Sequence, residues 1–328
     1  MTVPDDVQRA VPPPSATGVR QQWADLPGMI RVGIEERLGA TVVSARPRPG
    51  GFSPGLAAVV ETAAGDRAFV KAAGPEPNPA SPLFHRREAL VAAALPADAP
   101  VAHLQWSWDT GEDGWVVLAF DVVDGRQPEI PWAPNEVELV LGALDRLSAA
   151  LTPSPVSEAV VGRIETWGVL DGSWWLRTRM FPPDGLDGWS ARHLPALVEL
   201  ERAVPAAAAG ETLLHLDLRA DNILSGPAGV TVVDWPHARL GATWVDRAFL
   251  SPSLAMQGGP QPERTMARSG VGPPPDDAAL TAVVAAIAGF FTWQALAPPL
   301  PGLPTLRRFQ AAQGAIARSW LARRTGLG

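Results

Sequence analysis

The chain has 328 residues, carries a formal net charge of −7 at pH 7 and contains no cysteine. This length predicts two domains or two lobes with room for a sizeable core, and the missing cysteines exclude disulfides and thiolate metal sites. The acidic balance gives no general attraction to nucleic acid or to an anionic membrane. We therefore expect neither as a partner, and we expect a cytoplasmic protein that is a monomer or a homodimer.

The first third of the chain is predicted to be rich in strands. Residues 1–20 form a proline-rich leader that we expect to be flexible. Apolar positions at helical spacing predict a helix over 23–38, and Val-rich runs between Gly or Pro turns predict strands. The expected strands are 40–46, 56–62, 67–72, 103–108 and 115–123, and one helix, 82–95, follows the third of them.

Helical patterns dominate after residue 125. The expected helices are 135–151, 194–209, 276–297 and 306–324, and the short Val- and Leu-rich runs between them are 212–216 and 230–234. The stretch 251–275 is rich in Gly and Pro and predicts a long loop. The sequence therefore predicts an α+β fold with two lobes: a small β-rich N-lobe (21–124) and a larger, mainly helical C-lobe (125–328) that meet at a hinge over 123–126.

The segment 278–297 is almost entirely apolar and just long enough to span a bilayer. It contains Thr281, Thr292 and Gln294, lacks flanking basic anchors and ends in a proline cluster. These features favour a buried core helix over a membrane span.

The 27 basic residues comprise 26 arginines and a single lysine, Lys71. Arg and Lys exchange easily on a solvated surface, but not where a compact ammonium has to fit one site. Lys71 is therefore a candidate functional residue, although a chance survivor would look the same.

The densest polar cluster is HLDLRADN, residues 215–222, and Asp234 follows it at the end of a Val-rich run. Two short strands would bring Asp217, Asn222 and Asp234 to one rim. Carboxylate and amide oxygens suit Mg²⁺, which takes few protein ligands, and a remaining carboxylate can accept a proton from a hydroxyl. The alternative is a polar turn whose Asp and Asn residues cap helices.

HLDLRADN followed by VVDWP resembles the catalytic loop and metal-binding segment of the aminoglycoside phosphotransferase family, which is related to the protein kinases. The resemblance implies a protein-kinase-like fold, with Asp217 as the catalytic base and with Asn222 and Asp234 as Mg²⁺ ligands. It also implies a structural role for His215 and a bracing role for Asp246. Leu216 stands where most relatives have Gly, a departure that touches no catalytic side chain.

A kinase-like fold requires a lysine on the third strand that pairs with a Glu on the next helix and reaches the phosphates of the nucleotide. Lys71 and Glu88 stand at these places, in AFVKAA and HRREAL. This agreement is independent of the catalytic-loop motif.

The rest of the nucleotide site is less clearly marked. PGGFSPG, residues 49–55, lies where the family covers the phosphates, which makes Ser53 a candidate contact, although an ordinary hairpin turn would read the same. LAFDVVDG resembles the family's hinge. By that resemblance the base of ATP or GTP would bind the backbone at Asp121 and Val123, with Phe120 behind the pocket.

The resemblance implies a phosphotransferase that acts on a hydroxyl of a small molecule. From residue 251 onward three acidic residues face seven arginines, which predicts an antibiotic or related acceptor less cationic than a typical aminoglycoside. Trp167, Trp174, Trp175 and Trp189 either stack on the acceptor or pack between helices. The alternatives are a metabolic kinase for a sugar, choline or homoserine, and a catalytically silent nucleotide-binding protein. A protein kinase is disfavoured because no A-P-E segment follows Asp234.

Overall fold

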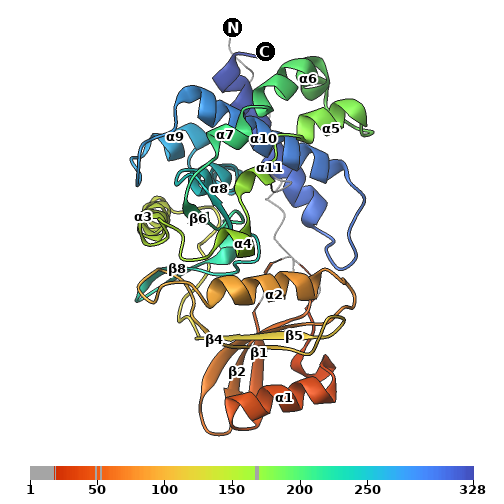
Figure 1. The fold of residues 1–328 in the computed structure, drawn as a ribbon, viewed down its shortest axis with the longest axis vertical. Helices are drawn as coiled ribbons and strands as arrows, with labels where there is room; N and C mark the ends of the chain where they lie inside the picture. Colours follow the sequence, from red (N-terminus) through yellow and green to blue (C-terminus); the bar gives the residue numbers. More distant parts are fainter. Residues whose placement is uncertain (1–17, 19, 49, 52–53, 167–169) are drawn as a thin grey trace.

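Two lobes are stacked along the long axis of the molecule, a small one built on a sheet and a larger helical one (Figure 1). The computed structural model describes residues 18, 20–48, 50–51, 54–166 and 170–328. The small lobe holds a five-stranded antiparallel sheet with the strand order β1-β2-β3-β5-β4. The predicted α+β, two-lobed fold is therefore confirmed. The elements of this lobe are η1 (Trp23–Asp25), α1 (Gly28–Leu38), β1 (Val42–Pro47), β2 (Leu56–Thr62), β3 (Arg67–Ala73), α2 (Ser81–Ala92), β4 (Leu104–Asp109) and β5 (Val116–Phe120).

The central strands of this sheet are apolar on both faces because a helix covers each face. In β5, Val117 and Ala119 pack in the cluster that contains Ile30 and Ile34 of α1, whereas the alternate residues Val116, Leu118 and Phe120 pack with Ala92 of α2. Successive strand residues point to opposite faces, so β3 obeys the same rule. Val70 and Ala72 face α1, and Lys71 therefore faces α2 and the C-lobe.

The first predicted helix, 23–38, was too long at its start. Residues 23–25 form a 3-10 turn, and α1 begins at Gly28 after Pro27. A proline fixes its own backbone and disfavours the helical conformation of the residue before it, so the two turns do not merge. Because Leu26, Ile30 and Ile34 all lie in the same buried cluster, one apolar periodicity runs across this break.

The C-lobe is mainly helical and carries short strands at its edge toward the N-lobe (Figure 1). Its helices are α3 (Pro134–Ala150), α4 (Glu158–Val161), η2 (Ile164–Thr166), α5 (Trp174–Met180), α6 (Gly188–Glu201), α7 (Val204–Ala207), η3 (Ala220–Asn222), α8 (Val245–Met256), α9 (Pro262–Ala267), α10 (Asp277–Leu296) and α11 (Leu306–Thr325). Its strands are β6 (Thr212–Leu214), β7 (Ile223–Gly226), β8 (Gly229–Val232) and β9 (Arg239–Gly241).

The segment predicted to be a long loop, 251–275, is helical over 251–256 and 262–267, so that prediction was wrong for about half of its length. Helix α8 continues to Met256 with Pro252 inside it, and α9 begins at Pro262. Residues 245–254 are all buried, so tertiary packing stabilises a helix that the proline alone would disfavour. The predicted helix 194–209 is likewise two helices, α6 and α7, and α5 was missed.

Helix α10 is the core helix that its composition predicted. By length and hydropathy it could cross a membrane, but 61% of its apolar window is buried inside the protein. Its buried residues lie on all sides of the helix, where it packs against α11 and the neighbouring helices of the C-lobe (Figure 1).

Candidate active site

A single ammonium group connects the two lobes at the cleft between them. The Nζ atom of Lys71 on β3 lies 2.7 and 2.8 Å from the two carboxylate oxygens of Glu88 on α2. The same atom lies 2.5 Å from Oδ1 of Asp234, which follows β8 in the C-lobe. The expected Lys71–Glu88 ion pair is therefore present, and Asp234 joins it.

Opposite charges in this cluster offset the cost of burial for Lys71 and Asp234, whereas burial and the charge of Asp234 raise the pKa of Glu88. Burial lowers the pKa of Lys71, but the carboxylates of Asp234 and Glu88 outweigh burial, and the net pKa of Lys71 is raised. Burial likewise raises the pKa of Asp234, but Lys71 outweighs it, and the pKa of Asp234 lies well below its usual range. Lys71 is therefore charged, and Asp234 is an ionised oxygen ligand at neutral pH.

His215 connects the ends of the two strands that carry the acidic residues. Its Nε2 lies 2.9 Å from the carbonyl oxygen of Val233, and its Nδ1 accepts the backbone N–H of Asp217 at 3.2 Å. Burial lowers the pKa of His215 to about 4, so the ring is neutral and these partners place its proton on Nε2. One side chain thus sets the position of Asp217 relative to Asp234, in line with the structural role implied for His215.

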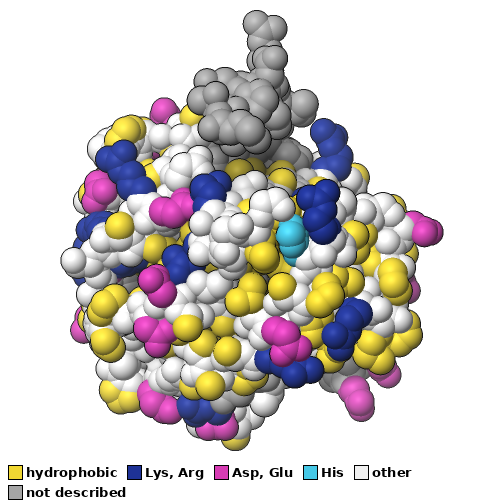
Figure 2. Space-filling model, turned by 90° about the horizontal axis from the view of Figure 1, so that it is seen from above, with side chains coloured by type: hydrophobic (Ala, Val, Ile, Leu, Met, Phe, Trp, Pro, Cys, Tyr) yellow, Lys and Arg dark blue, Asp and Glu magenta, His cyan; other side chains and the backbone are white. Residues whose placement is uncertain are grey.

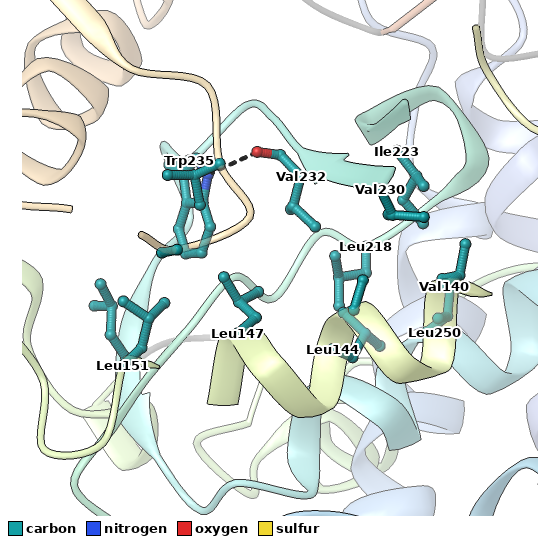
Figure 3. Packing of buried hydrophobic residues seen from close by; sticks show 14 of the residues in the cluster. Val140, Leu144, Leu147, Leu151, Leu218, Ile223, Val230, Val232, Trp235 and Leu250 are labelled. Carbon is teal, nitrogen blue, oxygen red and sulfur yellow. Dashed lines mark hydrogen bonds between the residues drawn. The ribbon is translucent and has the colours of Figure 1, made fainter. Parts of the chain in front are cut away.

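Two leucines anchor the catalytic loop in different hydrophobic clusters. Leu218 packs with Leu144, Leu147 and other residues of α3 (Figure 3). Leu216 packs in the second cluster, which contains α10. Asp217, between these two buried leucines, is half-buried, and its carboxylate contacts Asn222, which lines the cleft between the lobes.

Leu216 has a positive φ of 60°, which is costly for a residue with a side chain. Glycine adopts a positive φ without this cost because it has no Cβ atom, which explains why a Gly suits this position. Asp246 holds the strained turn, since its carboxylate accepts the N–H groups of His215 and Leu216, both at 2.8 Å. The hydrogen bonds that the resemblance implied for Asp246 are present.

The Asp217 carboxylate is held from two directions. Arg219 donates to Oδ1 at 2.5 Å, and Nδ2 of Asn222 donates to Oδ2 at 3.2 Å and to the backbone carbonyl of Asp217 at 2.8 Å. Arg219 also forms a two-pronged ion pair with Asp221. Burial raises the pKa of Asp217 even against the charge of Arg219, which suits a group that has to accept a proton.

Asn222 and Asp234 provide hard oxygen atoms at the same cleft. The amide nitrogen of Asn222 faces Asp217, so its oxygen is the atom left for a cation. Among the described residues, no group of three or more His, Cys, Asp or Glu side chains could hold a metal by itself. A carboxylate and an amide that share Mg²⁺ with phosphates and water fit this donor set.

The cleft between the lobes has a volume of about 310 Å³ and is lined by Lys71, Glu88, Asn222 and Asp234 among others. Phe120 and the backbone of residues 121–123 form its inner wall. Asp121 donates its N–H to the carbonyl of His103, and Val123 accepts from Gly125. No backbone bond within the described chain engages the carbonyl of Asp121 or the N–H of Val123, so both could bind a base. Ser53 lies outside the described residues.

Of the two possibilities for the tryptophans, stacking on the acceptor or packing between helices, the structure favours packing. Trp174 and Trp175 are buried in the C-lobe, with Trp175 bonded to the carbonyl of Ala285, and Trp189 bonds to the carbonyl of Leu327. They pack between helices and do not form a stacking surface; Trp167 lies outside the described residues.

Four of the seven C-terminal arginines are in ion pairs, namely Arg268, Arg318, Arg323 and Arg324. The excess of four arginines over acidic residues from residue 251 onward therefore does not describe a binding face. Basic and acidic side chains are also mixed on the face in Figure 2.

Two arginines, one lining the cleft and one beside the predicted base, were missed by the motif-based analysis. Arg20 was assigned to the flexible leader, but it lines the cleft, and Arg219 stands next to the predicted base. Arg219 falls inside HLDLRADN, and its spacing of two from both Asp217 and Asp221 was the signal that could have revealed it. No sequence signal marks Arg20.

A family model described as the phosphotransferase enzyme family matches residues 44–282. No curated protein matches the chain significantly. Three solved structures are similar over most of both chains. An aminoglycoside phosphotransferase in complex with ADP and hygromycin B has 15% identity, a TM-score of 0.57 and coverage of 88% of this chain and 98% of its own. The choline kinase of Streptococcus pneumoniae has 14% identity, a TM-score of 0.58 and the same coverage.

A spectinomycin phosphotransferase in complex with ADP and spectinomycin has 12% identity, a TM-score of 0.55 and coverage of 88% and 97%. At such low identity these structures establish a shared kinase-like fold. The family model spans well over half of the chain and includes Lys71, Asp217 and Asp234. The chain therefore belongs to the phosphotransferase enzyme family, as its motifs predicted.

Proposed function

We propose that this protein is a Mg²⁺-dependent phosphotransferase that moves the γ-phosphoryl group of ATP or GTP to a hydroxyl of an antibiotic or a related natural product. The observation that carries the proposal is the convergence of Lys71, Glu88 and Asp234 at one cleft between the lobes. Asp217 lies next to this cleft, where its carboxylate accepts a hydrogen bond from Asn222, one of the lining residues. The ADP in two of the similar structures supports a nucleotide as the phosphate donor.

Each residue has a role that follows from its contacts. Lys71, held by Glu88, binds the phosphates, and Asn222 and Asp234 would hold Mg²⁺, which would neutralise charge on the phosphates. The backbone at Asp121 and Val123 binds the base. Asp217 orients the acceptor hydroxyl and accepts its proton, while Arg219 and Asn222 fix the direction of the carboxylate.

The acceptor is proposed to be less cationic than a typical aminoglycoside. The support is local: Arg219 already pairs with both Asp217 and Asp221, the carboxylates on either side of it in the catalytic loop. To bind a polycation beside the catalytic loop, the protein would need additional carboxylates to pair with each ammonium that leaves water. A metabolic kinase for a sugar, choline or homoserine is the second candidate, favoured by the likeness to a choline kinase. We further propose a cytoplasmic enzyme, a monomer or homodimer, that has no nucleic-acid or membrane partner.

The test is transfer of labelled γ-phosphate to a panel of neutral sugars, nucleoside antibiotics, kanamycin-like aminoglycosides, choline, homoserine and fructosamines. Asp217→Asn should lower kcat about 10²- to 10⁴-fold and leave nucleotide binding intact, because a general base contributes about that factor. Glu211→Gln is the matched control, since Glu211 is exposed and pairs with Arg163 away from the cleft.

The outcomes separate the candidates. Transfer to neutral hydroxylated compounds supports the proposed acceptor class, and transfer to kanamycin-like compounds alone contradicts it. If the wild-type protein binds nucleotide and Mg²⁺ without transfer to any acceptor or to water, the catalytically silent alternative replaces the proposal.

A further inference from the structure

Arg20 lies outside every motif, yet it is part of the wall of the nucleotide cleft. It forms a parallel bridge with Gly55 just before β2, and the next residue, Gln21, donates its N–H to the carbonyl of Gly55 at 3.1 Å. Residues 20 and 21 therefore extend the edge of the sheet at the mouth of the cleft. This backbone pairing aims the Arg20 side chain along the cleft that Lys71 and Asp234 also line.

The guanidinium of Arg20 sits against the glycine loop that precedes β2. One of its nitrogens donates to the carbonyl oxygen of Gly50 at 2.5 Å. A Cβ atom placed on Gly51 would lie 2.7 Å from that nitrogen and 3.9 Å from Oδ2 of Asp221. The loop backbone, the guanidinium and the start of the η3 turn thus meet at one point, and the absence of side chains at Gly50 and Gly51 leaves room for them.

The electrostatics point the same way. Burial lowers the pKa of Arg20, and the charges of Asp234 and Asp221 act against burial, so the guanidinium lies in the negative field of the carboxylates that line the cleft. Lys71 also lines the cleft, and its ammonium is already shared between Glu88 and Asp234. A triphosphate brings several negative charges, so a further cation beside Lys71 and Mg²⁺ would stabilise it.

We propose that Arg20 is a nucleotide-binding residue that places its guanidinium on the phosphates of the donor, which makes the N-terminal segment part of the donor site. The planar fork of a guanidinium matches the oxygens of a phosphate, so one arginine can contact a phosphate and hold a loop carbonyl at the same time. The loop PGGFSPG departs from G-x-G-x-x-G and contains no basic residue. Arg20 supplies a positive charge next to this loop from a different part of the chain. This inference rests on the proposed function, because it assumes a nucleotide in the cleft.

The test compares the affinities of the full-length wild-type protein and its variants for adenosine, AMP, ADP and ATP with Mg²⁺, measured by calorimetry, or for the guanosine series if GTP is preferred. Arg20→Gln should weaken ATP binding about 10- to 100-fold, the usual effect of losing a charge-assisted hydrogen bond, and should leave adenosine binding unchanged. Arg20→Lys should recover part of the loss. The first member of the series to lose affinity identifies the phosphate that Arg20 contacts.

Arg46→Gln is the matched control, because Arg46 lies on β1 with a 64% exposed side chain and a surface ion pair to Glu61. Its ATP affinity should equal that of the wild type. If Arg20→Gln weakens adenosine and ATP equally, Arg20 acts by holding the loop, and the proposal is wrong. If Arg20→Gln binds ATP normally while Lys71→Met does not, the inference fails and the proposed function stands. If the wild-type protein binds no nucleotide, both fail together.

Discussion

Replacing Lys71 should separate the structural role of the ion pair from its role in transfer. Lys71→Met removes the ammonium but keeps the length of the side chain, and it leaves Glu88, with a side chain 2% exposed, buried and without its counter-charge. Removing one partner of a buried pair costs about 3–5 kcal/mol. Because Asp234 is 26% exposed and water can solvate it once Lys71 is gone, we expect the lower end, about 3 kcal/mol.

The double variant Lys71→Met with Glu88→Met tests this reasoning. Replacing a buried ion pair by apolar side chains is often neutral or stabilising, so the double variant should recover most of the free energy of unfolding but none of the phosphate transfer. Lys71→Arg should stay folded and lose activity, because a planar fork cannot occupy a position 2.5–2.8 Å from three carboxylate oxygens.

Urea unfolding without nucleotide gives the stability of each variant, and transfer of labelled phosphate gives its activity. A double variant as unstable as Lys71→Met would refute the account of the buried pair. Near-normal activity in Lys71→Arg would refute the role of Lys71 in holding the phosphates.

Two further predictions concern the framework. Burial raises the pKa of Glu201 to about 7 from an ordinary value of 4.5, so the wild type loses stability as the pH rises through this interval, by about 3 kcal/mol in total. Glu201→Gln lacks this loss, so urea unfolding should show it gaining about 3 kcal/mol on the wild type between pH 4 and pH 8; a pH-independent difference would contradict the assignment. Gly55→Ala should cost more stability than Gly65→Ala in the same assay. Both glycines have positive φ, but a Cβ on Gly55 would lie 2.6 Å from the carbonyl oxygen of Ala72, whereas Gly65 has open space. Equal losses would show that the clash is relieved.

The pairing of Lys71 with Glu88 was predictable because the family resemblance names both residues and the backbone periodicity of the sheet agrees with it. Alternation along β3 places Lys71 opposite to Val70 and Ala72, and α2 covers that face of the sheet with Glu88. The catalytic loop follows a similar logic, since Leu216 and Leu218 are buried and Asp217 is the residue between them. The resemblance names these residues, and the pattern of apolar and polar residues agrees with the direction in which the structure points them.

Other features of the site depend on contacts between distant parts of the chain. Arg20 reaches the cleft because residues 20 and 21 pair with Gly55, and nothing in the composition of the leader indicates this pairing. The left-handed backbone at Leu216 was equally hidden, because a buried Leu in an apolar run predicts an ordinary strand residue. Its strain is balanced by Asp246, thirty residues further along the chain.

The charge of the acceptor site was predicted least well, because the ion pairs between helices depend on how the helices pack. Counting residues from 251 onward treats the arginines as one basic face. In the fold, Arg318 pairs with Asp187 and Arg268 pairs with Asp145 and Glu138, all three from earlier parts of the chain. Helices cross one another, so helix packing decides which carboxylate lies near each arginine and neutralises it. Along a strand, by contrast, the alternation of side chains fixes the face on which each residue lies. The charge that an acceptor meets is therefore better judged at the catalytic loop, where Arg219 pairs with Asp217 and Asp221, than from the net charge of the C-terminal helices.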